Sequence, residues 1–495
     1  MTAVRGATQA ARVSVHRAPA SGYQSPQMAD TLRSVAATRR GGGLVSAVFD
    51  LERVKTPDPI DLFAVALQAG LEPTLWLQPI DGFSLVGIGS AWSVRADGPE
   101  RFGEVALEWE RVLARARIGG EASTARAVGP LLIGGLGFTG EVPADAAWTP
   151  FGAASLSVPE LLLLQTPGGR WLTASFLQSG ATGPSEPDRL QHLWHELAAG
   201  ANEAADAMTG PSSGALAVPL AIAAEHPDRR TWDRLVDRFA GAVGRGRLDK
   251  VVLARRLDVT APVKIDAVAA VRRLTSGSPT STTYAFARGG SVFVGATPER
   301  LISTQGKEFQ TVAIAGSIRH VDDAGEEAAL AAELLASDKD REEHEIVVEM
   351  LRTNLEPVAT ELHVAPAPVV AAFGTVQHLV TTVTGRLRDR AGILSLAGLL
   401  HPTPAVGGEP RGLALELIAE HEGFERGWYS GPIGWVGADG DGEFVVALRC
   451  GVVSGTTATL FAGCGIVADS DPAREWEESR NKMQVVAGAL GELQS

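Results

Sequence analysis

Cysteine and long apolar runs are both scarce in this chain. Its 495 residues include only two cysteines, Cys450 and Cys464, and neither lies in a CxxC pair or another spacing typical of metal ligands. No uninterrupted apolar run reaches the roughly 18 residues that a membrane-spanning helix needs, and no signal peptide opens the chain. The sequence therefore predicts a soluble, cytoplasmic protein without a membrane partner.

Basic residues are also in short supply. The chain has 44 lysines and arginines against 58 aspartates and glutamates, which gives a formal net charge of −14. We find no local basic patch, so the sequence predicts no nucleic-acid partner. Lysine occurs only at positions 55, 250, 264, 307, 339 and 482. Because the chain otherwise prefers arginine, a lysine that borders an apolar run is a candidate for a specific role.

Apolar residues are plentiful enough for a sizeable core, at 45% hydrophobic against 21% charged. Residues 1–40 carry several arginines and few acids, and we expect a flexible N-terminal tail there. Residues 41–226 contain alternating apolar and polar runs that are typical of antiparallel strands. A stretch rich in Ala, Pro, Ser and Gly, at 208–227, places the main boundary before a second part, residues 227–495.

The second part alternates helix and strand signals. Helical periodicity predicts helices at about 228–244, 264–274, 324–336, 338–355 and 471–493. Strand signals cover residues 250–259 and two hairpins, 282–295 and 300–315. A long strand is predicted over 369–387, with an interruption near Gln377 and His378.

Two of these helices carry acids on an apolar face. Glu475, Glu478 and Lys482 follow at i, i+3 and i+7, and Asp340 and Glu343 repeat the i, i+3 spacing on the earlier helix. A buried carboxylate is costly unless it meets a metal or a partner. Two such helices could supply oxygen ligands from opposite sides, which would suit Mg²⁺. The alternative is a pair of amphipathic helices whose acids border the apolar face and stay in water.

Two further residues could act on protons. Lys250 opens the apolar run 251–254, where desolvation could leave it neutral and able to act as a base, as an arginine could not. Glu299 lies in a turn-like segment and could act as a general acid. The alternatives are an ordinary strand-end lysine and a surface charge paired with Arg300. Spacing alone does not decide between these interpretations.

Eight short motifs, in this order, resemble the chorismate-utilising enzyme family. They are KVVLAR (250–255), GATPER (295–300), SDKDREEHE (337–345), VQHL (376–379), HPTPAVGG (401–408), RGWYSG (426–431), GCG (463–465) and REWEESRNK (474–482). The resemblance is strong from residue 228 to the end of the sequence and weaker upstream. Eight matches in register make it highly specific.

The resemblance implies a large α/β fold of the α+β type, with an antiparallel sheet core flanked by helices and a cleft for chorismate and Mg²⁺. The two parts would then be intertwined, and residues 227–495 would form the chorismate-binding catalytic region. By the same resemblance Glu343 and Glu478 hold Mg²⁺, with Asp340 and Glu475 as supporting or water-mediated acids. Asp340 stands where the family more often has Glu, and its shorter side chain favours an indirect role.

The resemblance also indicates a reaction. In the family, a lysine at the position of Lys250 accompanies water as nucleophile, and a small residue at the position of Gly407 accompanies release of isochorismate. Conversion of chorismate to isochorismate is therefore implied, for menaquinone or siderophore synthesis and without a glutaminase subunit. Lys250 would take a proton from the water that attacks ring carbon 2, while Glu299 protonates the hydroxyl that leaves carbon 4.

Other residues resemble the family's contacts with substrate. The enolpyruvyl carboxylate and neighbouring groups would be held by Tyr429, Arg449, Gly463, Gly465 and Lys482. An arginine fork suits a carboxylate. By the same resemblance, His378 and His401 line the same cleft.

Three alternative functions follow from the same motifs. A salicylate-forming enzyme is weakened by Gly407, and an aminating enzyme with a glutaminase partner is weakened by Lys250. A subunit that binds chorismate without catalysis would not require both Lys250 and Glu299.

Overall fold

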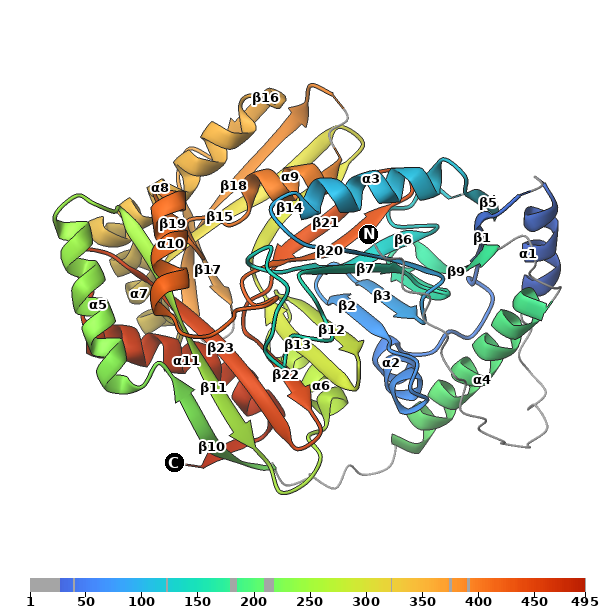
Figure 1. The fold of residues 1–495 in the computed structure, drawn as a ribbon, viewed down its shortest axis with the longest axis horizontal. Coiled ribbons are helices and arrows are strands. Elements are labelled where there is room, and N and C mark those ends of the chain that lie inside the picture. The colour runs from blue at the N-terminus through green and yellow to red at the C-terminus, as the bar shows by residue number, and fades with distance from the viewer. Residues whose placement is uncertain are drawn as a thin grey trace.

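The computed structural model describes residues 27–38, 41–121, 123–178, 185–208, 218–321, 323–373, 376–389 and 392–494. Within these residues the strands form two large, mostly antiparallel sheets (Figure 1). The larger sheet has the order β24 (Glu492–Gln494), β10 (Pro219–His226), β11 (Lys250–Thr260), β23 (Thr457–Ile466), β22 (Cys450–Ser454), β13 (Ser291–Thr297), β12 (Thr282–Arg288), β2 (Thr74–Gln78), β3 (Phe83–Ile88), β8 (Leu161–Thr166), β9 (Gly169–Gln178), β1 (Gly43–Asp50) and β5 (Arg117–Gly120), with β19 (Gly408–Glu409) paired to β11.

The smaller sheet carries β14, the strand that follows Glu299. Its order is β16 (Ala359–Val364), β18 (Val376–Leu387), β15 (Glu308–Arg319), β14 (Arg300–Gln305), β21 (Gly442–Val446), β20 (Pro432–Gly437), β6 (Leu131–Leu136), β7 (Ala154–Val158) and β4 (Trp92–Ala96), with β17 (Val369–Phe373) paired to β18.

Helices cover the outer faces of both sheets. The larger sheet shares one apolar cluster with α1 (Met28–Ala37), α2 (Pro59–Gln68), α4 (Ser185–Met208), α6 (Ala267–Gly277) and α11 (Pro472–Leu490). A second cluster joins the smaller sheet and the start of β11 to α3 (Arg101–Leu113), α5 (Arg229–Gly244), α8 (Asp338–Leu355), α9 (Ile393–Leu400) and α10 (Arg411–His421). A further helix, α7 (Ala324–Ala336), packs on β15. The expected antiparallel core flanked by helices is confirmed.

A layer of aromatic rings fills the space between the two sheets. Phe293 of the larger sheet lies 6.1 Å from Trp428 and 5.2 Å from Trp148, measured between ring centroids. The flanking residues Val292 and Val294 of the same strand point to the helices instead. This alternation is the period of two that places one face of a strand on each side of its sheet.

The predicted parts share both sheets. Strands β1 to β9 come from residues 41–226, yet β2 pairs with β12 and β6 pairs with β20. The predicted boundary at 208–227 contains β10, which pairs with β11 and so belongs with the second part. We therefore treat the described residues as one interlocked unit.

Two sequence predictions need correction. Residues 28–37 of the expected tail form α1, whose Met28 and Leu32 are buried against the larger sheet; residues 1–26, 39 and 40 lie outside the described residues. The predicted long strand over 369–387 is a hairpin, since β17 and β18 pair antiparallel and β18 runs through Gln377 and His378. None of the helices in the described residues combines the length and apolar character needed to span a lipid bilayer.

Candidate active site

The buried end of β11 brings Lys250 to Glu343. Lys250 is the first residue of β11, its side chain is 2% exposed, and its Nζ donates to Glu343 Oε1 at 2.6 Å from α8. A Cβ atom at Gly465, on the neighbouring β23, would lie only 2.3 Å from Lys250 Cε and 3.1 Å from Glu343 Oε1. Burial raises the pKa of Glu343, but Lys250 and Lys482 outweigh it and leave the pKa below its ordinary value. A side chain at position 465 would therefore displace the Lys250 side chain or the Glu343 carboxylate from this ion pair.

Glu299 faces the same group of charges from the segment that joins the two sheets. It lies between β13 and β14 and is buried, and Thr403 Oγ1 donates to its Oε1 at 3.4 Å. Burial raises its pKa from 4.5 to about 7, even though Lys250, Thr403 and Lys482 act in the opposite direction. A carboxyl group with this pKa is half protonated near neutral pH, as a general acid requires.

The start of α11 supplies a pair of close acids. Glu475, Glu478 and Cys464 place ligand atoms within 4.8 Å of one another, the one such group among the described residues. Burial and the charge of Glu478 raise the pKa of Glu475 to about 7. Glu475 is buried and Glu478 is partly exposed, and two carboxylates that repel each other would gain from a shared cation. Because Cys464 Sγ donates to the Glu475 carbonyl at 3.0 Å, the oxygens are the better ligands for a hard ion.

Asp340 and Glu343 do not join that group of ligand atoms. Asp340 bonds through its carboxylate to the Ser337 hydroxyl and accepts from the Ser317 amide at 3.4 Å, at the start of α8. The Glu343 carboxylate is instead paired with Lys250. Both Glu343 and Glu475 nevertheless feel the charge of Lys482, so the two sets of acids border one charged region.

A fixed guanidinium lies on the β18 side of the site. Arg449 donates from Nη1 to the Phe373 carbonyl at 2.9 Å, and its Nη2 lies 3.2 Å from His378 Nε2. Burial lowers the pKa of His378 well below its usual range, and Arg449 lowers it further. The neutral imidazole then accepts from Arg449 and donates from Nδ1 to the Gly316 carbonyl at 3.2 Å. Arg449 is thus oriented as well as charged.

Lys482 connects α11 to β23. Its Nζ lies 2.7 Å from Glu478 Oε1 and donates to the Gly463 carbonyl at 3.1 Å. A Cβ atom at Gly463 would lie 2.9 Å from Tyr429 Oη, which places the phenol against this strand. Burial lowers the pKa of Lys482, but Glu478 more than compensates and the pKa ends above its usual range. Lys482 is therefore a charged group at neutral pH.

His401 and Gly407 lie at the two ends of one loop. His401 packs on Phe102 and Phe138, donates from Nε2 to the Phe138 carbonyl at 3.0 Å, and has its pKa lowered to about 3 by burial. Its described contacts therefore support the loop. Gly407 accepts from the Val252 amide at 2.9 Å, which ties the loop to β11.

Sequence reasoning missed two side chains near these residues. Thr403, which bonds to Glu299, lies inside the HPTPAVGG motif two positions after His401, so the motif itself was the available signal. Cys464 lies between the two glycines of GCG, and only the fold brings it to Glu475. Local spacing in the sequence could not predict that contact.

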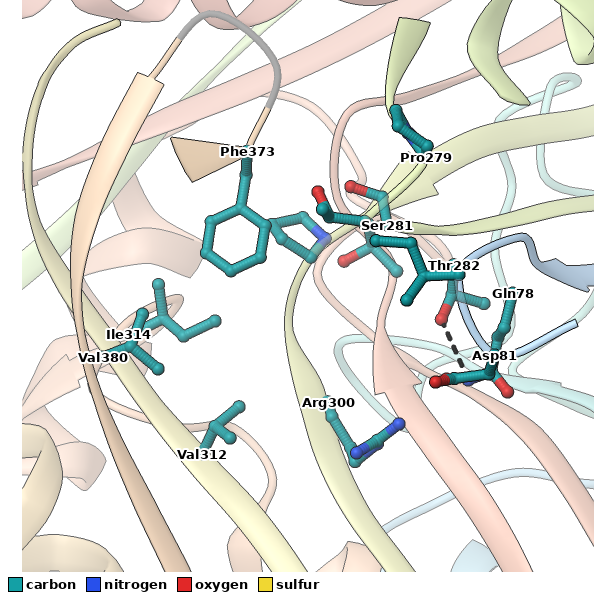
Figure 2. A pocket seen from close by; sticks show the side chains of 14 residues that line it. Gln78, Asp81, Pro279, Ser281, Thr282, Arg300, Val312, Ile314, Phe373 and Val380 are labelled. Atoms are coloured by element: carbon teal, nitrogen blue, oxygen red, sulfur yellow. Dashed lines mark hydrogen bonds between the residues drawn. The ribbon is translucent and has the colours of Figure 1, made fainter. Parts of the chain in front are cut away.

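A cavity of about 190 Å³ lies beside this region, behind the segment that precedes Glu299 (Figure 2). Thr297, Pro298 and Arg300 line it, whereas Glu299 does not. Figure 2 shows Gln78, Asp81 and Arg300 on one side and Val312, Ile314, Phe373 and Val380 on the other. Pro298 and Arg300 therefore border this cavity, whereas Glu299 between them faces the charged group around Lys250.

Comparison with known proteins decides the family. The family model described as chorismate binding enzyme matches residues 31–491. The chain belongs to this family. A salicylate biosynthesis isochorismate synthase from Pseudomonas aeruginosa is 35% identical over 91% of this chain and 90% of its own length. The isochorismate synthase MenF of Bacillus subtilis is 35% identical over 84% of this chain and 87% of its own.

Two solved structures share the fold. The menaquinone-specific isochorismate synthase MenF from Escherichia coli has a TM-score of 0.70 at 25% identity, covering 93% of this chain and 97% of that one. Anthranilate synthase component I from Streptococcus pneumoniae has a TM-score of 0.64 at 22% identity, covering 82% and 92%. The second likeness concerns the fold alone.

Proposed function

We propose that this chain is an isochorismate synthase, an isomerase that converts chorismate to isochorismate. The observation that carries the proposal is the buried pair of proton-handling groups, Lys250 and Glu299, within one charged region. Both side chains are largely withdrawn from water, and Lys250 is among the charges that act on the pKa of Glu299. The isochorismate synthases to which the chain is similar support the same conclusion.

In the proposed reaction, Lys250 accepts a proton from water as the oxygen bonds to ring carbon 2. The ring double bonds shift, and the hydroxyl on carbon 4 departs as water after taking the proton of Glu299. Each proton transfer contributes about 10²- to 10⁴-fold to the rate. Lys250 is paired with Glu343 at 2.6 Å and can act as a base only as the neutral amine, so the pair has to open and the ammonium has to release a proton before water is activated.

The carboxylates of the proposed substrate would meet fixed cations. Arg449, held by Phe373 and His378, presents a guanidinium whose fork matches a carboxylate. Lys482 adds a charged ammonium that Glu478 and Gly463 already orient. Groups held this way lose little freedom when substrate binds, which favours orientation of the ring.

The cofactor that we propose is Mg²⁺. Glu475 and Glu478 fit it best, because they are close, one is buried, and burial together with the charge of Glu478 raises the pKa of Glu475. Glu343 would become a further ligand once its ion pair with Lys250 opens. Asp340, which accepts a hydrogen bond from the Ser317 amide, would be a supporting acid and not a direct ligand. When bound, Mg²⁺ would neutralise the ring carboxylate of chorismate.

We further propose that water, and not ammonia, is the nucleophile and that the reaction stops at isochorismate. Lys250 supports the first point, so no glutaminase subunit is expected. Gly407 supports the second. A larger side chain would fit at this position, since a Cβ atom there would lie 3.4 Å from Pro402 and Thr403, an ordinary contact distance. The proposed location is the cytoplasm, where the buried free thiols Cys450 and Cys464 would stay reduced.

The test is to incubate purified protein with chorismate, with and without Mg²⁺ and in a separate arm with ammonium, and to separate the products by chromatography. We expect isochorismate alone, and only with Mg²⁺. Salicylate with pyruvate would assign the chain to salicylate-forming enzymes, and an aminated product would overturn the role given to Lys250. No conversion in any arm would leave a chorismate-binding subunit.

A further inference from the structure

A completely buried carboxylate lies next to the segment that carries Glu299. The Glu443 side chain is 0% exposed and accepts three hydrogen bonds. Its Oε1 receives Gln78 Nε2 at 2.6 Å and Arg300 Nε at 3.2 Å, and its Oε2 receives Arg126 Nη2 at 2.7 Å. These donors come from three distant parts of the chain. We call Glu443 with these three partners the Glu443 clamp.

The Glu443 clamp reaches the chain beside Glu299 through Arg300. Arg300 directly follows Glu299 and opens β14, which pairs with β21, the strand of Glu443. The pairing slips between Arg300 and Ile302. Slips of this kind bend a strand and redirect its side chains, and they are common beside active sites.

The backbone of Glu299 is tied to the same strand. The Val446 amide donates to the Glu299 carbonyl at 3.0 Å, and Thr297 Oγ1 donates to the Val446 carbonyl at 2.6 Å. The Glu299 amide in turn donates to Thr297 Oγ1 at 3.2 Å. The position of β21 therefore sets the position of the Glu299 backbone.

Arg300 and Glu299 point away from each other. Arg300 lines the cavity of Figure 2, close to Gln78, whereas Glu299 turns to Thr403 and the charges around Lys250. Successive side chains of an extended segment leave on opposite faces, so holding one fixes the direction of the other. A guanidinium anchored on Glu443 therefore limits rotation of the segment that aims Glu299.

We propose that Glu443 is a positioning residue for the reaction, and that it aims the carboxyl group of Glu299 by fixing Arg300. The inference rests on the proposed function, in which Glu299 is the general acid. It also gives residues 41–226 a part in catalysis, since Gln78 donates to the same Glu443 oxygen as Arg300 and Arg126 donates to the other.

The two arginines of the Glu443 clamp provide a matched comparison. Arg300 and Arg126 are similarly exposed, at 28% and 27%, and each donates to Glu443, but only Arg300 is next to Glu299. We expect Arg300→Gln to lower kcat about 10- to 100-fold, because a displacement of an ångström can cost that much. Arg126→Gln should lower kcat much less. The KM for chorismate should change in neither variant, since neither side chain contacts the proposed substrate site.

Two further variants separate positioning from general loss of stability. Arg300→Lys keeps a cation beside Glu443 and should recover part of the lost kcat. Glu443→Gln combined with Arg300→Gln should be no slower than the slower single variant, because both changes break one contact. Asp61→Asn, which weakens a partly buried ion pair between Asp61 of α2 and Arg272 of α6, should leave kcat unchanged. Thermal unfolding of each variant confirms that folded protein is compared.

The outcomes are distinct. Equal losses of kcat in Arg300→Gln and Arg126→Gln, or additive losses in the double variant, would overturn the positioning role. If the wild-type protein forms no isochorismate, the proposed function itself fails. If the wild type is active and Glu299→Gln is inactive while Arg300→Gln keeps full kcat, only the present inference is refuted.

Discussion

Glu299 and Glu443 lie on chain segments that bond to each other, and both are buried, yet their surroundings differ in one respect. Among the described residues the Glu443 side chain receives three donors, two of them arginines, whereas the Glu299 side chain receives a single hydrogen bond, from Thr403. Burial raises the pKa of Glu299 to about 7. Burial acts on Glu443 in the same direction, but the two arginines outweigh it and hold its pKa below the usual value. The number and charge of the hydrogen-bond donors, more than burial, therefore distinguish Glu299, which can give up a proton, from Glu443, which has a structural role.

The sharpest way to break this comparison is to remove the proton of Glu299. We expect Glu299→Gln to lower turnover by about 10²- to 10⁴-fold, since the amide keeps the shape but cannot protonate the leaving hydroxyl. The rate of isochorismate formation measures this effect. Glu308→Gln, at an exposed ion pair on β15, is the control. Wild-type turnover in Glu299→Gln would remove Glu299 from the chemistry.

Lys250→Ala should have an effect of the same order, because the proposed base is lost. Its control is Lys307→Ala, at an exposed lysine that donates to the Arg388 carbonyl. The fold should survive, since Lys250 lies at the end of β11. A variant that still forms isochorismate at the wild-type rate would contradict the role of Lys250.

The same Glu→Gln substitution should change stability in opposite directions at the two sites. Glu443→Gln leaves two arginines near a neutral amide and should cost about 3 kcal/mol at pH 8. Glu299 has a folded pKa near 7 against its ordinary 4.5, so its contribution to stability falls as pH rises through this interval. Glu299→Gln should therefore raise the melting temperature at pH 8 by about 2 °C or more, and not at pH 4. Equal signs in thermal unfolding would refute the comparison.

Glu478→Ala should raise the Mg²⁺ concentration needed for half-maximal activity about 10- to 100-fold. Titration of activity with Mg²⁺ is the measurement. Glu477→Ala is matched to it, since Glu477 lies on the same helix and pairs with Arg480 in solvent. An unchanged requirement in Glu478→Ala would place the metal elsewhere.

The smallest expected effect concerns pH. If Glu299 must be protonated, kcat/KM should fall as pH rises through about 7. The hydrogen bond from Thr403 lowers the pKa of Glu299, so Thr403→Val should move this fall to higher pH by less than about one unit. Thr360→Val, at an exposed threonine on β16, should leave the profile in place. A shift to lower pH would contradict the assignment.

Much of the fold could be predicted from local patterns. The bounds of α7 and α8 match the predictions, because Asp323 and Ser337 cap the two helices where apolar periodicity begins. By contrast, α1 was hidden in an arginine-rich segment, although Met28, Leu32 and Val35 have helical spacing and are buried. The sequence predicted the hairpin of β17 and β18 as one strand, because both strands have a similar pattern of apolar residues and the pattern does not show where the chain reverses.

The site likewise contains some contacts that the sequence predicts and others that it does not. Motif positions indicated Lys250, Glu299, Glu343 and the acids of α11, and the structure brings Lys250 to Glu343 and Glu475 to Glu478. Whether these groups catalyse and bind metal stays a prediction. The Glu443 clamp could not be predicted, because its members Gln78 and Glu443 are 365 positions apart and no spacing rule joins them.

The pairing of Lys250 with Glu343 also bears on how the chain is made. The two residues are 93 positions apart, so a growing chain exposes Lys250 well before its partner is synthesised. Until then β11 would have to place an unpaired ammonium in an apolar setting, and α11, which supplies Lys482, arrives later still. We therefore expect the site to close late in synthesis, and a nascent chain stalled before residue 343 to leave the start of β11 accessible to chaperones.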